Sequence, residues 1–314
     1  MMFKLNIKGV NSMSEIILEL KDVTKMFGKD KVLNRVNLTI FKGDIYGLIG
    51  RNGAGKTTLM KIITDLTRKT SGEIFLLSNR SYIKNLERVG AIIESPVAYV
   101  NLSAYQNLKI LCMQKGIQDY AVIDEALQFV NLTNTGKKKF KQFSLGMKQR
   151  LGLAMALLNN PDFLILDEPI NGLDPIAIIE FREILERINR EKNTTILISS
   201  HILSELYQVS NRFGFIHNGE IIEEITKKEL DDKCSSTIVI ETTQIEQLSV
   251  LLEKLQVNFK VINDKQVQLK GNTINVANLN QQMFESGIRI DEIRRNDENL
   301  EEYYTNLLLK VGEK

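Results

Sequence analysis

The sequence has little of what secreted, membrane-spanning or metal-binding proteins require. It contains only two cysteines, Cys112 and Cys234, far apart and without partners at ligand spacing. This argues against a disulfide framework or a cysteine metal site and favours a reducing compartment, and we expect both thiols to be buried. The longest apolar runs fall far short of the roughly 18 consecutive apolar residues that cross a membrane, so any membrane role is expected to be peripheral.

An excess of charge of one sign is also missing. The 41 basic and 39 acidic residues leave a net charge of +2, too close to neutral to indicate a nucleic-acid-binding protein. Residues 1–13 are too polar for a secretory signal. We expect them to be an extension, with Met13 as an alternative start. The length of 314 residues and the 43% hydrophobic content favour a soluble protein with one domain of ordinary size and an appendage.

The first part of the chain predicts strands and then a helix that opens directly from a glycine-rich loop. Short apolar segments bounded by glycine or alternating with charge predict strands at residues 16–20, 32–41 and 45–49. After Gly55, apolar residues recur at helical spacing. These residues are Leu59, Ile62, Ile63 and Leu66.

Residues 95–158 have mostly helical periodicity, which we interpret as a helical subdomain inserted into an α/β core. One apolar stripe contains Leu102, Tyr105, Leu108 and Leu111, and another contains Val122, Ala126, Phe129 and Val130. Strands are predicted again at residues 163–166, 195–199 and 213–217, with a helix at 176–190. Alternating strands and helices predict a largely parallel sheet.

A change of composition predicts a domain boundary near residue 225. Residues 14–225 are expected to form the α/β domain, and residues 226–314 a small α+β module. The module is predicted as strand, helix, two strands, helix, strand and a final helix. Their ranges are 237–241, 245–255, 259–261, 266–270, 276–285, 288–293 and 300–310.

The glycine-rich loop at residues 50–57, GRNGAGKT, matches the pattern G-x-x-x-x-G-K-[ST] between a predicted strand and a predicted helix. Its glycines allow backbone N–H groups to converge on phosphates at a helix N-terminus. Lys56 adds a positive charge, and the Thr57 hydroxyl can reach Mg²⁺. The alternative is a glycine-rich turn before an ordinary helix. The predicted ATP-binding residues are Gly50, Asn52, Gly53, Ala54, Gly55, Lys56, Thr57 and Thr58.

Two adjacent carboxylates, Asp167 and Glu168, end the apolar strand FLIL. Asp167 is expected to hold Mg²⁺, and Glu168 to orient or deprotonate the attacking water. Without the loop, two surface acids at a turn before Pro169 would be an equal interpretation. Together the two motifs predict a P-loop NTPase.

The segment Phe143-Ser-Leu-Gly-Met147, followed by KQRLGLAMALL, resembles the signature of the ATP-binding cassette (ABC) family, usually written L-S-G-G-Q. It precedes the paired acids, where that family carries its signature. The resemblance covers residue 16 to about residue 225. It implies that Ser144 and the backbone of Gly146 close on the γ-phosphate of ATP bound to a second subunit. Taken alone, these residues would describe a Ser-capped amphipathic helix.

The resemblance implies roles for three further residues. Asp174, in NGLD, matches the D-loop that communicates across the dimer. His201, after TTILISS, matches the switch histidine that touches the γ-phosphate, although a lone histidine such as His217 is more often structural. Phe27 matches the aromatic residue that stacks on adenine, and packing in the core is its alternative.

The chain departs from the family pattern at three positions. Glu94, in AIIESPVAY, stands where the family usually has a glutamine that senses Mg²⁺ and faces the transmembrane partner. A carboxylate can still ligate magnesium, so Glu94 stays a candidate ligand beside Thr57 and Asp167. Leu145 replaces the first glycine of the signature, and Met147 replaces its glutamine. These changes are expected to affect the timing of closure of the two subunits and its coupling to the transmembrane partner. They are expected to leave phosphate binding intact.

Residues 91–108 and 143–158 look similar to the ATPases of bacitracin-resistance and lantibiotic-immunity exporters, and the C-terminal module looks like an accessory domain of such ATPases. The resemblance implies a homodimer on the cytoplasmic face of the plasma membrane that powers separately encoded transmembrane permease subunits. Residues 94–101 and the start of the following helix are expected to face the permease, with loop packing of Pro96, Tyr99 and Asn101 as an equal interpretation. The alternative function is a soluble ABC ATPase of translation or repair. Translation factors of this kind carry two cassettes and repair members carry long insertions, neither of which is present.

Overall fold

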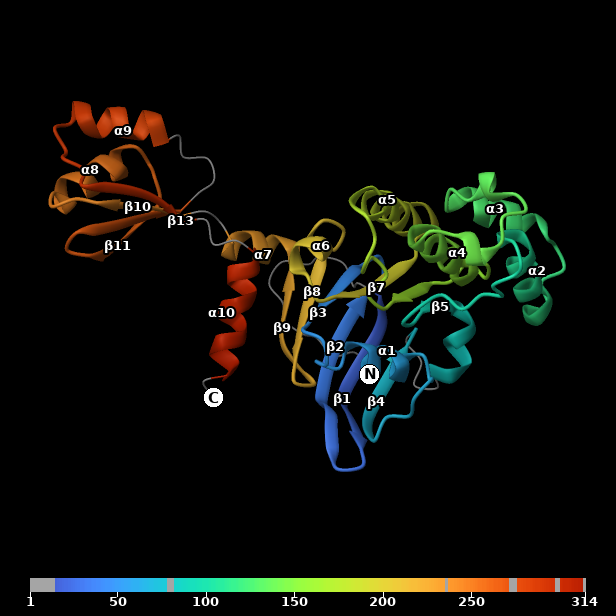
Figure 1. Cartoon of the computed structure of the whole chain (residues 1–314). Coiled ribbons are helices and arrows are strands. Elements are labelled where there is room, and N and C mark those ends of the chain that lie inside the picture. Colours follow the sequence, from blue (N-terminus) through green and yellow to red (C-terminus); the bar gives the residue numbers. More distant parts are fainter. Residues whose placement is uncertain (1–14, 78–81, 235–236, 271–275, 297–299, 313–314) are drawn as a thin grey trace. The chain divides into compact units, whose positions relative to one another are not determined.

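The structure is a computed structural model that describes residues 15–77, 82–234, 237–270, 276–296 and 300–312. The predicted extension at residues 1–13 lies outside this part. The chain divides into two compact units after Lys227, and each is described by itself (Figure 1). Among the helices in the described ranges, none is long and apolar enough to cross a membrane.

A six-stranded sheet forms the centre of the first unit. Its strands lie in the order β5-β6-β7-β3-β8-β9, all parallel except the edge strand β9. The bounds are β3 Ile45–Ile49, β5 Val89–Ile92, β6 Phe163–Leu166, β7 Thr195–Ser200, β8 Arg212–His217 and β9 Glu220–Thr226. Strands β3, β6 and β7 are buried along their whole length, as expected for a parallel sheet covered on both faces. The predicted, largely parallel α/β sheet is confirmed.

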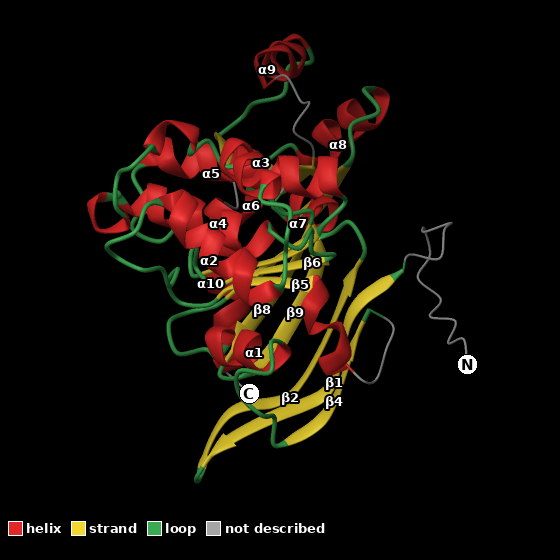
Figure 2. Ribbon diagram, turned by 90° about the vertical axis from the view of Figure 1, so that its right-hand side faces the viewer, coloured by secondary structure: helices red, strands yellow, loops and turns green. Residues whose placement is uncertain are grey.

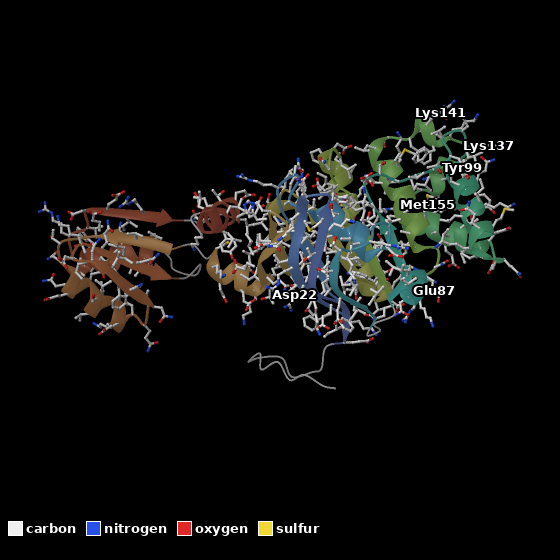
Figure 3. All side chains as sticks on the ribbon, turned by 90° about the horizontal axis from the view of Figure 1, so that it is seen from below. Asp22, Glu87, Tyr99, Lys137, Lys141 and Met155 are labelled. Atoms are coloured by element: carbon white, nitrogen blue, oxygen red, sulfur yellow. The ribbon has the colours of Figure 1, made fainter. Side chains whose placement is uncertain are left out.

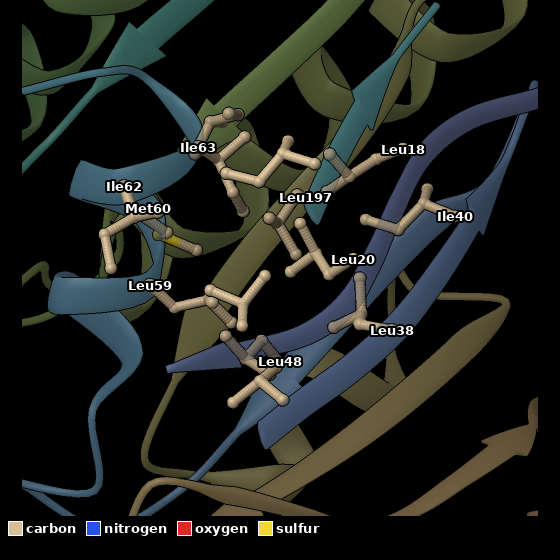
Figure 4. Close-up of a cluster of buried hydrophobic side chains, with 14 of the residues drawn as sticks. Leu18, Leu20, Leu38, Ile40, Leu48, Leu59, Met60, Ile62, Ile63 and Leu197 are labelled. Carbon is tan, nitrogen blue, oxygen red and sulfur yellow. The ribbon is translucent and has the colours of Figure 1, made fainter. Parts of the chain in front are cut away.

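A three-stranded antiparallel sheet packs over the first helix of this unit. Its order is β2-β1-β4, with β1 Ile16–Phe27, β2 Asp30–Phe41 and β4 Ser71–Leu76. The buried face of α1 (Lys56–Ile63) meets apolar side chains of this sheet and of β3, β6 and β7 in one core. Figure 4 shows Leu59, Met60 and Ile62 of α1 in this core. The strand, loop and helix that contain the phosphate-loop motif are therefore held in the centre of the unit.

Helices and short 3₁₀ turns fill the chain between β5 and β6, and Figure 2 shows α2, α3 and α4 grouped away from the three-stranded sheet. The predicted helical insertion is confirmed. The α-helices of the first unit after α1 are α2 Ala104–Lys115, α3 Ala121–Phe129, α4 Leu145–Leu157, α5 Pro175–Lys192 and α6 Leu203–Tyr207. The 3₁₀ turns η2 Thr133–Thr135 and η3 Phe140–Gln142 lie in this insertion, whereas η1 Tyr82–Arg88 precedes β5.

The predicted helical stripes differ from the structure in detail. Helix α1 ends at Ile63, and Asp65 takes a left-handed backbone with φ of 58°. Leu66 therefore lies outside the helix and is 65% exposed. Helix α2 begins only after Ser103, which forms a reciprocal capping box with Gln106, so Leu102 precedes it. In α3 the buried positions are Ile123 and Leu127, one residue beyond the predicted Val122 and Ala126. Val130, just past the helix, is buried.

The second unit contains a four-stranded antiparallel sheet in the order β11-β12-β10-β13. Chain order and strand order together are those of a ferredoxin-like βαββαβ fold. Helices α8 and α9 pack on the sheet through a separate apolar core. The elements after the first unit are α7 Lys227–Lys233, β10 Thr237–Glu241, α8 Ile245–Lys254, β11 Phe259–Asn263, β12 Gln266–Lys270, α9 Val276–Glu285, β13 Glu292–Asn296 and α10 Leu300–Gly312.

Two predictions for this unit need correction. The last strand was expected at residues 288–293 but is β13, Glu292–Asn296. Ile288 lies just past the end of α9 and not in the strand. Its N–H donates to the Met283 carbonyl, after Gly287 with φ of 71°. Its side chain packs in the core of this unit. Cys112 is buried as expected, but Cys234, just past the end of α7, is only half-buried.

Candidate nucleotide site

The phosphate loop leaves β3 at Gly50 and enters α1 at Lys56. Close packing explains two of its glycines. A Cβ at Gly50 would lie 2.6 Å from the Ile216 side chain, and one at Gly55 would lie 2.7 Å from Leu33. Gly55 also has φ of 108°, which L-residues rarely adopt. The loop is thereby held against β8 and β2, and it delivers the N-terminus of α1 to one end of the sheet.

The ammonium group of Lys56 lies inside this loop. Its Nζ donates to the carbonyl oxygens of Gly50 at 2.6 Å and Arg51 at 3.1 Å, and it lies 3.1 Å from Oε1 of Glu168. The residue is only 5% exposed. A buried cation beside a glycine-rich helix N-terminus suits an anionic ligand.

Thr57 and Asp167 meet at the carboxyl end of β6. The Thr57 hydroxyl donates to Oδ2 of Asp167 at 2.6 Å, and Asp167 is 3% exposed. Adjacent hydroxyl and carboxylate oxygens are the donors that Mg²⁺ prefers, usually with phosphate oxygens and water completing its shell. The two residues present therefore fit a magnesium ion.

Glu168 is surrounded by polar partners on three sides. Besides Lys56, its carboxylate lies 2.8 Å from Nδ1 of His201 and 3.4 Å from Nδ2 of Asn171. Its backbone has φ of 45°, a sparsely populated region that points to an imposed conformation. The two residues predicted as catalytic, Glu168 and His201, are thus brought together although they are far apart in sequence.

These neighbours also set the protonation of Glu168. Burial raises the pKa of the carboxyl, but the hydrogen bonds and charges of Lys56 and His201 outweigh burial and lower the pKa below its ordinary value. Glu168 is therefore a carboxylate at neutral pH. In that form it can accept a proton or orient a water molecule.

Comparison with known proteins decides which family this site belongs to. Residues 33–171 match a family model described as ABC transporter. The chain is 38% identical over 299 residues to the bacitracin transport ATP-binding protein BcrA of Enterococcus faecalis, a match that covers 94% of this chain and 97% of that relative. This chain belongs to the ABC transporter ATP-binding proteins. It is also 50% identical over 208 residues to the lantibiotic transport ATP-binding protein SrtF of Streptococcus pyogenes, which covers 66% of this chain and 90% of that relative.

Solved ABC structures agree with this assignment. The ATP-binding subunit of an ABC transporter superposes with a TM-score of 0.61 at 30% identity, covering 69% of this chain and 92% of that one. A dimeric ATP-binding cassette bound to ADP and Pi, in a post-hydrolysis state, superposes with a TM-score of 0.60 at 25% identity, covering 67% and 99%. As a member of the ABC family, the protein is an ATPase.

The signature and D-loop residues of this ABC ATPase start two neighbouring helices. Ser144 caps α4, where its Oγ accepts from the Met147 N–H at 3.3 Å, and Asp174 caps α5 by accepting from the Ala177 N–H at 2.9 Å. A Cβ at Gly146 would lie 3.1 Å from Ala177, so the two helix starts are close together. Their observed partners belong to α4 and α5 and not to the phosphate loop.

Two other predicted residues have exposed side chains. Phe27 ends β1 and is 52% exposed, and the Lys25 ammonium lies 4.5 Å from the centre of its ring. The core-packing alternative for Phe27 is therefore not what the structure has. Glu94 takes a left-handed backbone with φ of 65° and pairs with Lys61 of α1 at 2.5 Å. Among the described contacts, its carboxylate does not touch Thr57 or Asp167.

One well-connected residue was missed by the sequence predictions. Ser199 of β7 is fully buried and hydrogen-bonds both Asp167 and Glu168. The sequence contains a pattern that could have indicated this residue. Two serines follow the apolar run ILI in the strand, although a buried parallel strand is normally apolar. Its partners could not be read from the sequence, because β6 is the neighbour of β7 only in the folded sheet.

Proposed function

We propose that this chain is the ATP-hydrolysing subunit of an exporter that removes an antimicrobial peptide through separately encoded membrane subunits. The similarity to bacitracin transport ATP-binding proteins carries the proposal, because it spans both units and covers 97% of the relatives from Enterococcus faecalis and Bacillus licheniformis. The lantibiotic relative is more identical but matches over only 66% of this chain. A bacitracin-like peptide is therefore the first substrate to test, and a lantibiotic the second.

Within one subunit, the roles follow from the contacts. The phosphate loop, Lys56 and Thr58 at the start of α1 would bind the ATP phosphates. Phe27 would stack on adenine. Thr57 and Asp167 would hold Mg²⁺, which would neutralise phosphate charge, with Glu94 as a further candidate ligand. Glu168 would accept the proton of the attacking water, and His201 would hold the Glu168 carboxylate and touch the γ-phosphate.

Two copies are proposed to act together. In one subunit Ser144 and Asp174 cap their own helices, and Gly146 of α4 lies against Ala177 of α5. These three residues are proposed to complete the site of a second copy. The dimeric ATP-binding cassettes among the structural relatives support this arrangement. Glu168→Gln should hold an ATP-dependent dimer in size-exclusion chromatography, because the carboxylate that starts hydrolysis is removed. A strictly monomeric, fully active variant would contradict the model.

The permease is proposed to contact the segment at residues 94–101, from the cytoplasmic face of the membrane. Ser95, Pro96 and Val97 line a groove of about 450 Å³ together with Leu111 and Met155. Val97 and Tyr99 are largely exposed, and Figure 3 labels Tyr99 and Met155 on this part of the molecule. Crosslinking from a cysteine introduced at Tyr99 to a co-expressed permease would test the contact.

The decisive experiment is a resistance assay in a susceptible host that expresses the chain with its permease. Bacitracin and a lantibiotic are each titrated against wild type, Glu168→Gln and the control Glu186→Gln, which changes an exposed residue of α5. We expect resistance with wild type and the control, and none with Glu168→Gln. Equal sensitivity of all three strains to both peptides would contradict the proposed substrate class.

A further inference from the structure

The Ser199 hydroxyl links the two carboxylates of the site. Its Oγ lies 2.8 Å from Oδ1 of Asp167 and 2.9 Å from the backbone N of Glu168. A backbone N–H can only donate, so the single hydroxyl proton of Ser199 points to Asp167. Both hydrogen bonds therefore have a fixed direction.

The position of Ser199 in the sheet explains this double contact. Strand β7 lies between β6, which ends in the two acids, and β3, which ends in the phosphate loop. Leu166, the last residue of β6, pairs with Ile198, so Asp167 and Ser199 are the residues that follow this pair. Leu48 of β3 pairs with Ser199 on the other side. An apolar side chain would fill such a buried position without the penalty of burying a hydroxyl.

The two carboxylate oxygens of Asp167 have different hydrogen-bond partners. Oδ1 accepts from Ser199, and Oδ2 accepts from Thr57. With Oδ1 engaged, the carboxylate plane is held so that Oδ2 stays beside Thr57. The same hydroxyl accepts the N–H of Glu168, whose left-handed backbone directs its side chain to Lys56 and His201. One buried group thus orients both acids.

We propose that Ser199 is a positioning residue for the ATPase reaction, acting through Asp167 on magnesium binding and through Glu168 on hydrolysis. The inference rests on the proposed roles of those two acids. Partners that orient metal ligands typically contribute about 10- to 100-fold to metal affinity or activity. Removal of the hydroxyl should therefore weaken Mg²⁺-dependent nucleotide binding and lower kcat, while nucleotide binding without metal stays unchanged.

The test compares Ser199→Thr with Ser199→Val, two side chains of the same shape that differ in the hydroxyl. A fluorescent ADP analogue is titrated with and without Mg²⁺, and kcat for ATP is measured separately. We expect Ser199→Val to raise the Mg²⁺ concentration for half-maximal binding about 10-fold and to lower kcat about 10-fold or more. Ser199→Thr should stay close to wild type. If the valine variant does not fold, Ser199→Ala removes the hydroxyl without added volume and gives the same readouts.

Ser200→Ala is the matched control. Ser200 is also buried on β7, but its hydroxyl contacts Glu205 and the N–H of Ile202, so its loss should leave the Mg²⁺ dependence unchanged. Equal Mg²⁺ dependence and kcat in the threonine and valine variants would overturn the proposal, as would an equal effect of Ser200→Ala. If wild type bound ADP equally well with and without Mg²⁺, the proposed metal role of Thr57 and Asp167 would be overturned instead. The difference in kcat between the threonine and valine variants would then decide the role of Ser199.

Discussion

At the scale of single residues, the site contains a buried pair of opposite charges, Lys56 and Glu168. Glu168 contacts both Lys56 and His201, although the three residues are far apart in sequence. Lys56 and Glu168 are mostly buried. Such a pair is stable only while both charges are present, since an unpaired buried charge is strongly penalised. The protonation of Glu168 should therefore affect the stability of the nucleotide-free protein.

The lowered pKa of Glu168 predicts a pH effect with a definite sign. Because the folded-state pKa lies below the ordinary value of 4.5, the carboxylate contributes stability above that pH and loses it as the pH falls through the folded-state pKa. The difference in free energy of unfolding between wild type and Glu168→Gln should shrink on acidification. Urea unfolding of both proteins at neutral and acidic pH measures it. A difference that stays constant or grows would contradict the prediction.

The Glu94–Lys61 pair should behave differently, because both side chains reach solvent, at 65% and 34% exposure. Exposed ion pairs contribute about 0–1 kcal/mol. A double-mutant cycle of Glu94→Gln and Lys61→Met, measured by urea unfolding, should give a coupling energy below about 1 kcal/mol that falls further in high salt. A coupling of several kcal/mol would mean that the pair is more shielded than its exposure indicates.

At the scale of elements, a tyrosine side chain of β3 passes over a glycine of the neighbouring strand β8 and forms a hydrogen bond with β9. Tyr46 of β3 is fully buried, and its hydroxyl donates to Glu224 of β9 at 2.7 Å. Strand β8 lies between them, and a Cβ at Gly214 of β8 would overlap the Tyr46 hydroxyl. Burial raises the pKa of both Tyr46 and Glu224, so the hydroxyl keeps its proton for this bond. Gly214 is needed for close packing and not for a turn.

We predict that Gly214→Ala destabilises the first unit by about 1–3 kcal/mol, as overpacking of a filled core does. Thermal and urea unfolding would measure the loss. Tyr46→Phe removes the atom that is overlapped, so the double variant should lose less than the sum of the two single losses. Strictly additive losses would show that the alanine is accommodated in another way.

At the scale of the whole molecule, the chain consists of a cassette and a ferredoxin-like unit, each with its own core. The family model ends within the cassette, at residue 171. The SrtF match covers 66% of this chain but 90% of that relative. Nearly the whole of this relative therefore matches about two thirds of the present chain.

We predict that a chain ending at Lys227 folds cooperatively and binds ADP. The reason is that every nucleotide-site residue and the whole six-stranded sheet precede this point. Calorimetry of unfolding and ADP titration would test the prediction, with the full chain as control. A truncated chain that fails to unfold cooperatively would show that the cassette depends on the second unit.

The sequence by itself determined the features that depend on neighbouring residues. Glycine spacing, the helix that opens at Lys56 and the apolar strand before Asp167 are local, so pattern and backbone preference were sufficient. The order of elements from β10 to α10 followed for the same reason, whereas β4, β5, α6 and α7 were not predicted. Errors also appeared at helix ends such as Asp65, where a single backbone angle decides.

Only the tertiary structure decided which of these features meet. The order β6-β7-β3 puts Ser199 between the acids and the phosphate loop, and hydrogen bonds between strands far apart in sequence leave no local pattern. The same order brings His201 to Glu168 and Glu168 to Lys56. The sequence thus named most of the parts of the site. Strand pairing and burial decided how these parts hold one another.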